Sequence, residues 1–154
     1  MRLRAMLSKI PNVILINQPL DRTATFSLYG QADAVISLHR SEGFGLVPAE
    51  GMLAGRPVIS TDWSGPTDFL NKENGVPVGY KLVAASDPQG FYEHPSMTWA
   101  EPDVYDAAGK LNSLLDRRFR THIGARAQRD ASEQFSAVAY VRRVAGLLEF
   151  PSPC

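Results

Sequence analysis

The sequence predicts an α/β fold, a Rossmann-like parallel sheet flanked by helices. Short apolar runs alternate with amphipathic stretches, which is typical of strands joined by helices in a parallel sheet. Three of these runs, at residues 13–16, 34–38 and 57–60, are rich in Val and Ile, as expected of strands that are covered on both faces. Amphipathic stripes near the C-terminus supply further covering helices.

Residue types that begin and end helices predict the connections in the first half of the chain. A short helix opens the chain. Asp21 suits the N-cap of a second helix that reaches Tyr29. Pro48 suits the first position of the next helix and Gly55 suits its end. A short helix is also expected at residues 67–70.

The second half of the chain divides into an irregular part and a helical part. The pattern is lost over residues 71–102, which are rich in Pro, Gly and Asn, and a strand or hairpin at 76–83 is the only element expected there. One apolar helical stripe covers residues 104–115. A second helix is expected at 123–135, and a third begins after Ser136.

Length and composition limit the class of protein. The 154 residues suffice for one domain, predicted as residues 1–150 with a disordered tail at 151–154. Lys+Arg and Asp+Glu both number 16, and this balance predicts no nucleic acid partner. The one cysteine, Cys154, excludes an intrachain disulfide and fits a reducing, cytoplasmic location. No apolar run approaches the roughly 18 residues that span a bilayer, while a membrane-bound acceptor stays open.

Residues 41–52 combine the end of a strand, a glycine-containing loop and a helix N-terminus. Ligands of open α/β sheets bind where such loops lie. Gly43 and Gly45 let the backbone approach a ligand, and the free N–H groups of the first helical turn suit a diphosphate. Glu42 and Glu50 bracket the loop and are expected to point into one crevice, as acceptors for vicinal hydroxyls. Each feature alone also has a structural explanation, a tight turn or a charge that favours the helix dipole.

A longer run around this loop resembles the hallmark of family-four glycosyltransferases, which have the two-domain GT-B fold: SLHRSEGFGLVPAEGMLAGRPVIST. In that family the C-terminal domain carries a Glu, seven residues and a second Glu. The chain has Gly51 where Ala is usual, and both residues 32–40 and the helical region from Val104 match the flanking pieces. The resemblance implies a partial C-terminal domain of a GT-B enzyme. The two strands that normally open this domain, their basic diphosphate-binding pair and the acceptor domain are expected to be missing.

The same resemblance implies a role for each matching residue. Glu42 would be catalytic, close to the donor sugar and its developing positive charge, and Glu50 would hold the ribose hydroxyls. Backbone amides for the sugar and the diphosphate would come from Gly43, Phe44, Gly45, Leu46 and Val47. Such enzymes are metal-independent, so no cofactor is expected, and no Cys/His cluster has metal-ligand spacing.

Further candidates lie beside the loop. Arg40 is a candidate phosphate ligand, with a surface salt bridge as the alternative, and His39 is expected to be packed and hydrogen-bonded. Ser64 and Gly65 follow the next strand, where the family has a glycine-rich loop that lines the donor site. Trp99 is expected in the core or in a lid.

These observations predict the donor-binding part of a retaining glycosyltransferase, with transfer of a hexose from a nucleotide-diphosphate sugar to a saccharide or lipid-linked acceptor, as in polysaccharide biosynthesis. The alternatives are a non-catalytic nucleotide-sugar-binding module, a subunit that needs a partner chain, and a hydrolase, which the anion-binding loop disfavours.

The missing strands predict unpaired apolar edges at 13–16 and 34–38. These edges either pair directly or join two copies, and the homodimer is favoured. The expected location is the cytoplasm, with a place at the inner face of a membrane through the acceptor half left open.

Overall fold

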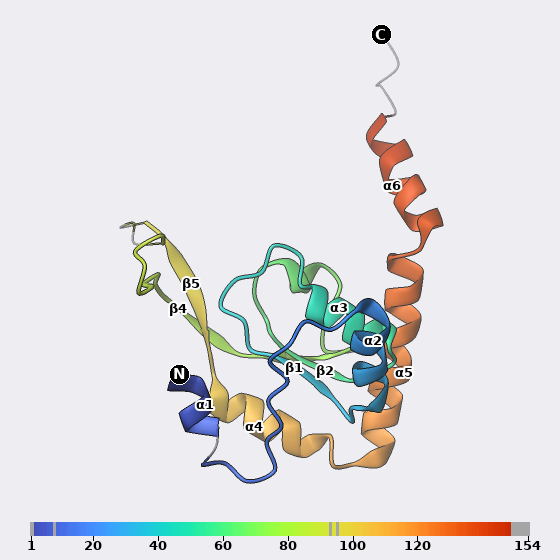
Figure 1. The fold of residues 1–154 in the computed structure, drawn as a ribbon. Coiled ribbons are helices and arrows are strands. Elements are labelled where there is room, and N and C mark those ends of the chain that lie inside the picture. Colours follow the sequence, from blue (N-terminus) through green and yellow to red (C-terminus); the bar gives the residue numbers. More distant parts are fainter. Residues whose placement is uncertain (1, 8, 93, 95, 149–154) are drawn as a thin grey trace.

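The computed structural model describes residues 2–7, 9–92, 94 and 96–148 (Figure 1). At its centre is a parallel sheet of three strands, in the order β1-β2-β3, which confirms the predicted α/β class. The strands are β1 (Val35–Ser37), β2 (Val58–Thr61) and β3 (Val76–Val78). The apolar runs at 34–38 and 57–60 therefore form neighbouring strands, as predicted.

Helices cover both faces of this sheet. The helices that pack on the strands are α3 (Leu46–Leu53) and α5 (Arg117–Gln134) on one side and α4 (Val104–Ser113) on the other. The described chain also contains α1 (Arg2–Leu7), α2 (Arg22–Gln31), α6 (Ala137–Leu148) and a 3-10 turn, η1 (Gly65–Asp68). Successive residues of a strand face opposite sides. Val58 accordingly packs into a core with Met52 of α3 and Ala127 of α5, whereas its neighbour Ile59 packs on the other face with Ala107 of α4.

Three predicted caps are confirmed, at Asp21, Ser136 and Gly55, whereas α5 begins at Arg117, earlier than the expected residue 123. Asp21 accepts a hydrogen bond from the Ala24 N–H at 2.7 Å at the start of α2. The Oγ of Ser136 accepts one from the Ala139 N–H at 3.0 Å at the start of α6. Gly55 follows α3 with φ of 72°, a conformation that favours glycine. Figure 1 shows α6 projecting from the end of α5, away from the sheet.

The prediction of a buried strand at residues 13–16 is wrong. These residues are extended but pair with no strand, and their exposed fractions run from 41% for Leu15 to 88% for Ile14. A strand that is buried on both faces needs neighbours on its edges and layers above and below. Among the described residues nothing supplies these neighbours, and β1 is an edge strand of the sheet.

The stretch predicted as largely irregular holds more structure than expected. The expected strand or hairpin at 76–83 divides into β3, which joins the sheet, and β4 (Tyr80–Ala84), which leaves it. β4 pairs antiparallel with β5 (Thr98–Pro102), and Figure 1 shows this hairpin rising at one end of the sheet. Residues 151–154, the predicted tail, lie outside the described residues. No helix in the described part of the chain combines the length and hydrophobicity that crossing a bilayer requires.

Candidate functional site

The loop between β1 and α3 ends in a glycine whose conformation fixes the start of the helix. Gly45 has φ of 92°, and a Cβ on it would lie 2.5 Å from Cγ of Pro66. The helix therefore begins at Leu46, and Pro48 is its third residue rather than its first. Because proline has no N–H, the first turn presents the N–H groups of Leu46 and Val47, and neither has an acceptor within the described residues.

A second loop, at the end of β2, holds the backbone around Glu42. The Glu42 N–H donates to Oγ of Ser64 at 2.9 Å, and the Ser64 hydroxyl donates to the Glu42 carbonyl. The Gly65 N–H donates to that same carbonyl at 3.0 Å. A Cβ on Gly65 would lie 2.4 Å from the carbonyl oxygen of Gly43. Ser64 and Gly65, predicted as ligand contacts, are thus hydrogen-bonded to the backbone of the β1–α3 loop.

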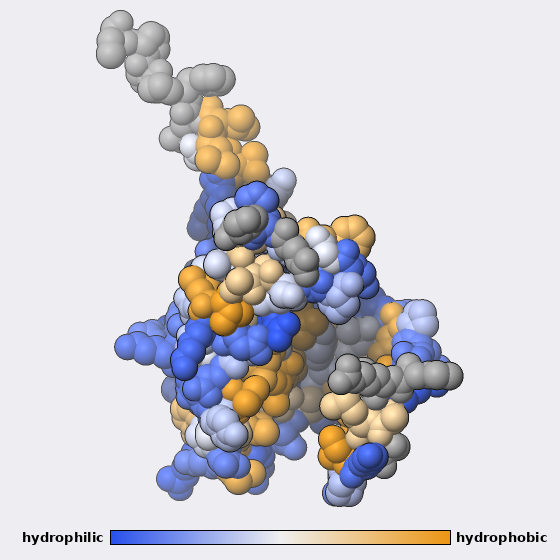
Figure 2. Space-filling model, turned by 90° about the vertical axis from the view of Figure 1, so that its left-hand side faces the viewer, coloured by the Kyte–Doolittle hydropathy of each residue, from blue (hydrophilic) through white to orange (hydrophobic). Residues whose placement is uncertain are grey.

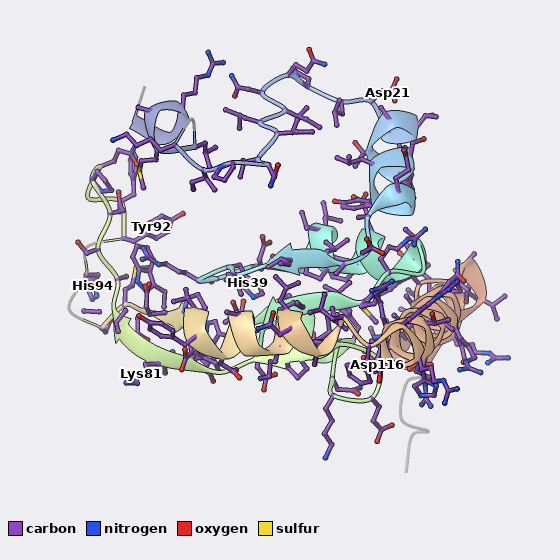
Figure 3. All side chains as sticks on the ribbon, turned by 90° about the horizontal axis from the view of Figure 1, so that it is seen from below. Asp21, His39, Lys81, Tyr92, His94 and Asp116 are labelled. Carbon is purple, nitrogen blue, oxygen red and sulfur yellow. The ribbon has the colours of Figure 1, made fainter. Side chains whose placement is uncertain are left out.

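Glu42 lines a pocket of about 560 Å³ between the β1–α3 loop and the β4–β5 hairpin. The loop contributes Arg40, Ser41, Glu42 and Gly43, and the hairpin contributes Ala85, Tyr92, Met97, Thr98 and Trp99. Figure 3 shows Tyr92 pointing from the hairpin toward the side on which His39 lies. His39 is packed and hydrogen-bonded as predicted, with Nε2 at 2.9 Å from the Trp63 carbonyl oxygen. The face drawn in Figure 2 is hollowed, and hydrophobic side chains reach the surface along the hollow.

Arg40 is bound to the hairpin. Its guanidinium lies 2.7 Å from the Glu101 carboxylate and 5.0 Å from the centre of the Trp99 ring, and its carbonyl accepts from the Ala100 N–H at 2.9 Å. The alternative of a surface salt bridge is therefore the one that the structure shows. Because both partners are about half exposed, the ion pair contributes little to the free energy of unfolding, although it fixes the hairpin beside the loop.

Glu50 lies in the second turn of α3 and lines a different pocket, of about 460 Å³. Its carboxylate faces Tyr29 of α2. The pKa of the Tyr29 hydroxyl is raised by burial first, then by the charge of Glu50 and by the hydrogen bond to it. This pocket is lined by α2, α3 and the junction of α5 and α6: Arg22, Phe26, Phe44, Leu46, Ala49, Glu50, Leu53, Gln134, Phe135, Ser136, Tyr140 and Arg143.

Glu42 and Glu50, which were expected to point into one crevice, thus line two pockets. The helix begins two residues earlier than predicted, which places Glu50 one turn along α3 and toward α2. Phe44 stands between the two glutamates in the sequence, and its ring packs against Phe69 at 5.3 Å and Phe135 at 5.5 Å. The two carboxylates mark the two ends of the loop, each with its own pocket.

Sequence reasoning missed several residues of these pockets. Trp99 was expected as a core or lid residue, but its place beside Glu42 was not predicted, and neither Arg22 nor Arg143 was a candidate. The signal in the sequence that could have indicated the pocket was Trp99, a large aromatic residue in a stretch rich in Pro and Gly. In the described part of the chain no three His, Cys, Asp or Glu side chains gather closely enough to hold a metal ion.

The sequence of the chain is similar to a known family and to curated proteins. Residues 2–96 match the family described as "Glycosyl transferases group 1". The chain is 34% identical over 123 residues to D-inositol 3-phosphate glycosyltransferase of Xylanimonas cellulosilytica, a match that covers 79% of this chain and 24% of the relative. It is 28% identical over 129 residues to an alpha-1,3/1,6-mannosyltransferase of Rhizomucor pusillus, which covers 83% of this chain and 24% of that protein.

The fold is also similar to solved structures. The crystal structure of Anabaena HepE in complex with UDP and glucose superposes with a TM-score of 0.69 at 20% identity, over 96% of this chain and 35% of HepE. The HepE complex with UDP-glucose gives a TM-score of 0.66. The chain thus has the architecture of part of a GT-B structure, and it spans about a quarter of the length of the curated relatives that it matches.

Proposed function

The chain belongs to the glycosyl transferases group 1, and on this premise we propose that it is the donor-binding part of a retaining glycosyltransferase that uses a nucleotide-diphosphate sugar. The spacing of Glu42 and Glu50 is that of the family-four enzymes, in which the first glutamate serves the sugar and the second the ribose. The reaction is the transfer of a hexose to a saccharide or lipid-linked acceptor.

The arrangement of two pockets at the ends of one loop carries this proposal. A nucleotide-sugar has two hydroxylated rings, a ribose and a hexose, joined by a diphosphate. Glu42 and Glu50 each offer a carboxylate that accepts hydrogen bonds from hydroxyls, and they lie in separate pockets. Between them along the chain are the free N–H groups of Leu46 and Val47, at the positive end of the α3 dipole. The order of these groups matches the order of groups in the ligand.

The charges at this site suit the departure of a nucleoside diphosphate. The helix N-terminus stabilises the negative charge that develops on the leaving group. Arg22 and Arg143 line the Glu50 pocket and add positive charge on the side assigned to the nucleoside. Glu42 lies at the other end, where an anionic carboxylate stabilises positive charge on the sugar ring. No metal ion or cofactor is required by this scheme.

The names of the relatives support sugar transfer, and the substrates of this chain are part of our proposal. HepE was crystallised with UDP-glucose, so UDP is the first nucleotide to test. The chain spans about a quarter of the length of its curated relatives, and its acceptor, a saccharide or a lipid-linked molecule, is part of the proposal. A cytoplasmic location fits a nucleotide-sugar donor.

Replacing Glu50 with alanine is expected to weaken UDP binding by about tenfold or more, because hydrogen bonds to a charged group contribute about 1.5–3 kcal/mol. Isothermal titration calorimetry of the two proteins measures the difference. Glu73→Ala is the matched control, since Glu73 is well exposed and lines neither pocket. Equal binding by Glu50→Ala and the unmodified chain would remove Glu50 from the ribose role.

The chain is also expected to form a homodimer. The exposed apolar residues 13–16 and the free edge of β1, where Ile36 is 47% exposed, together favour strand pairing with a second copy. Light scattering over a concentration series should show a dimer, and Ile14→Lys should shift it to monomer. Leu147→Lys, on the exposed surface of α6, is the control and should leave the dimer intact. A strict monomer at high concentration would contradict the proposal.

A further inference from the structure

The β4–β5 hairpin stands apart from the sheet and covers one side of the Glu42 pocket. Its strands pair only with each other among the described elements. Leu82 and its partner Ala100 share one face of the hairpin, and Val83 and Trp99 share the other. Ala100 is buried, whereas Leu82 and Val83 are exposed, so each face keeps an exposed apolar side chain. Neither of the core clusters found among the described residues contains a residue of the hairpin.

The connection between hairpin and loop is specific. Arg40, two residues before Glu42, is held by Glu101 through the ion pair and by Trp99 through the ring contact. The Ala100 N–H adds a backbone hydrogen bond to the Arg40 carbonyl. Three successive residues of β5 thus bind one residue of the loop, and Trp99 and Glu42 line the same pocket.

The chemistry of this pocket is divided between its two walls. The loop side carries the Glu42 carboxylate, an acceptor for hydroxyl groups. The hairpin side carries the rings of Trp99 and Tyr92, whose centres are 6.3 Å apart, and the side chain of Met97. Aromatic rings offer rigid apolar area with a polar end. A pyranose has the complementary division, since its hydroxyls lie around the rim and its C–H groups form apolar faces.

We propose that the hairpin forms the apolar wall of a pyranose subsite, in which Trp99 determines sugar recognition opposite Glu42. The inference rests on the proposed function for the position of the nucleotide, and it adds the residues that recognise the sugar. The volume of about 560 Å³ lies within the usual range of small-ligand pockets. The pyranose is either the hexosyl group of the donor or a ring of the acceptor, and both present the same chemistry to the indole.

The experiment compares three ligands on one spectroscopic probe. The indole Nε1–H signal of Trp99, assigned with Trp99→Phe, is followed in a ¹⁵N correlation spectrum during addition of UDP, UDP-glucose or methyl α-D-glucopyranoside. A shift with UDP-glucose beyond that with UDP assigns the pyranose to the donor. A shift with the glucoside assigns it to the acceptor. Absence of both shifts overturns the proposal.

Affinity provides the second readout. Trp99→Ala should lower the affinity of the pyranose-bearing ligand by about fivefold to tenfold, the range of an aromatic contact, while UDP binding changes less than twofold. Phe91→Ala is the matched control, because Phe91 is an exposed aromatic residue of the same hairpin that does not line the pocket. Equal losses for UDP and UDP-glucose would give Trp99 a structural role and overturn the inference. If UDP does not bind to the unmodified chain, the proposed function fails, and the glucoside titration still decides the pyranose subsite.

Discussion

Gly65→Ala is expected to destabilise the chain by about 1–3 kcal/mol, the usual cost of forcing extra volume into a packed site. Its Cβ would lie 2.4 Å from the carbonyl oxygen of Gly43 and 2.8 Å from Cα of Phe44. These are backbone atoms, so a side-chain rotation cannot relieve the contact, and the loop itself must move. Urea unfolding followed by circular dichroism measures the change in the free energy of unfolding.

Gly43→Ala is the matched control for this prediction. A Cβ on Gly43 would meet nothing within 4 Å, and its φ is not in the left-handed region. The free energy of unfolding should therefore stay within about 0.5 kcal/mol of the unmodified chain. If the two variants unfold alike, the close approach of the two loops does not determine stability. Gly65→Ala should also weaken UDP binding, because it displaces the loop that leads into α3.

Glu42→Gln is expected to reduce sugar transfer by about a hundredfold or more while leaving the melting temperature nearly unchanged. The substitution keeps the shape of the side chain and removes its charge, and a charged group aimed at a transition state commonly contributes such factors. The assay uses a chain that carries both the donor and the acceptor part. Glu73→Gln, an exposed glutamate far from the loop in sequence, is the control for general charge effects.

Two results would contradict this role for Glu42. A large fall in melting temperature would identify the Glu42 side chain as structural, because the substitution leaves the backbone hydrogen bonds to Ser64 in place. Transfer at the original rate would remove Glu42 from the catalytic role, whereas nucleotide-sugar binding without transfer by the unmodified protein would favour the non-catalytic alternative.

The sequence correctly predicted the strands whose neighbouring strands and covering helices are part of this chain. Residues 58–61 form a strand whose side chains are all buried, because helices pack on both of its faces. Residues 35–37 pair beside it, with Val35 in the core and Ile36 exposed. Residues 13–16 have an equally apolar pattern but no neighbouring strand, and a pattern of apolar residues does not report whether that neighbour exists. The hairpin was only partly predicted, because β4 is largely exposed and its partner β5 follows an irregular segment.

The site was predicted in its residues more than in its geometry. The position of the loop after a strand follows from local sequence. The start of α3, by contrast, depends on Gly45 packing against Pro66. These two residues lie in different loops, so no local sequence pattern contains their contact. Because the helix starts two residues earlier than predicted, Glu50 lies in its second turn, where its carboxylate faces Tyr29.

Gly51 has a consequence for how this sequence varies. It stands where the family pattern has alanine, and a Cβ on it would lie 3.0 Å from a methyl group of Val35 and 3.0 Å from one of Val58. Glycine inside a helix costs about 1 kcal/mol relative to alanine, and here it permits close approach of α3 to two β-branched residues. Substitutions at the three positions are therefore coupled and not additive. An alanine at position 51 is best tolerated after a smaller side chain has appeared at 35 or 58, so the order of substitutions determines which intermediates remain folded.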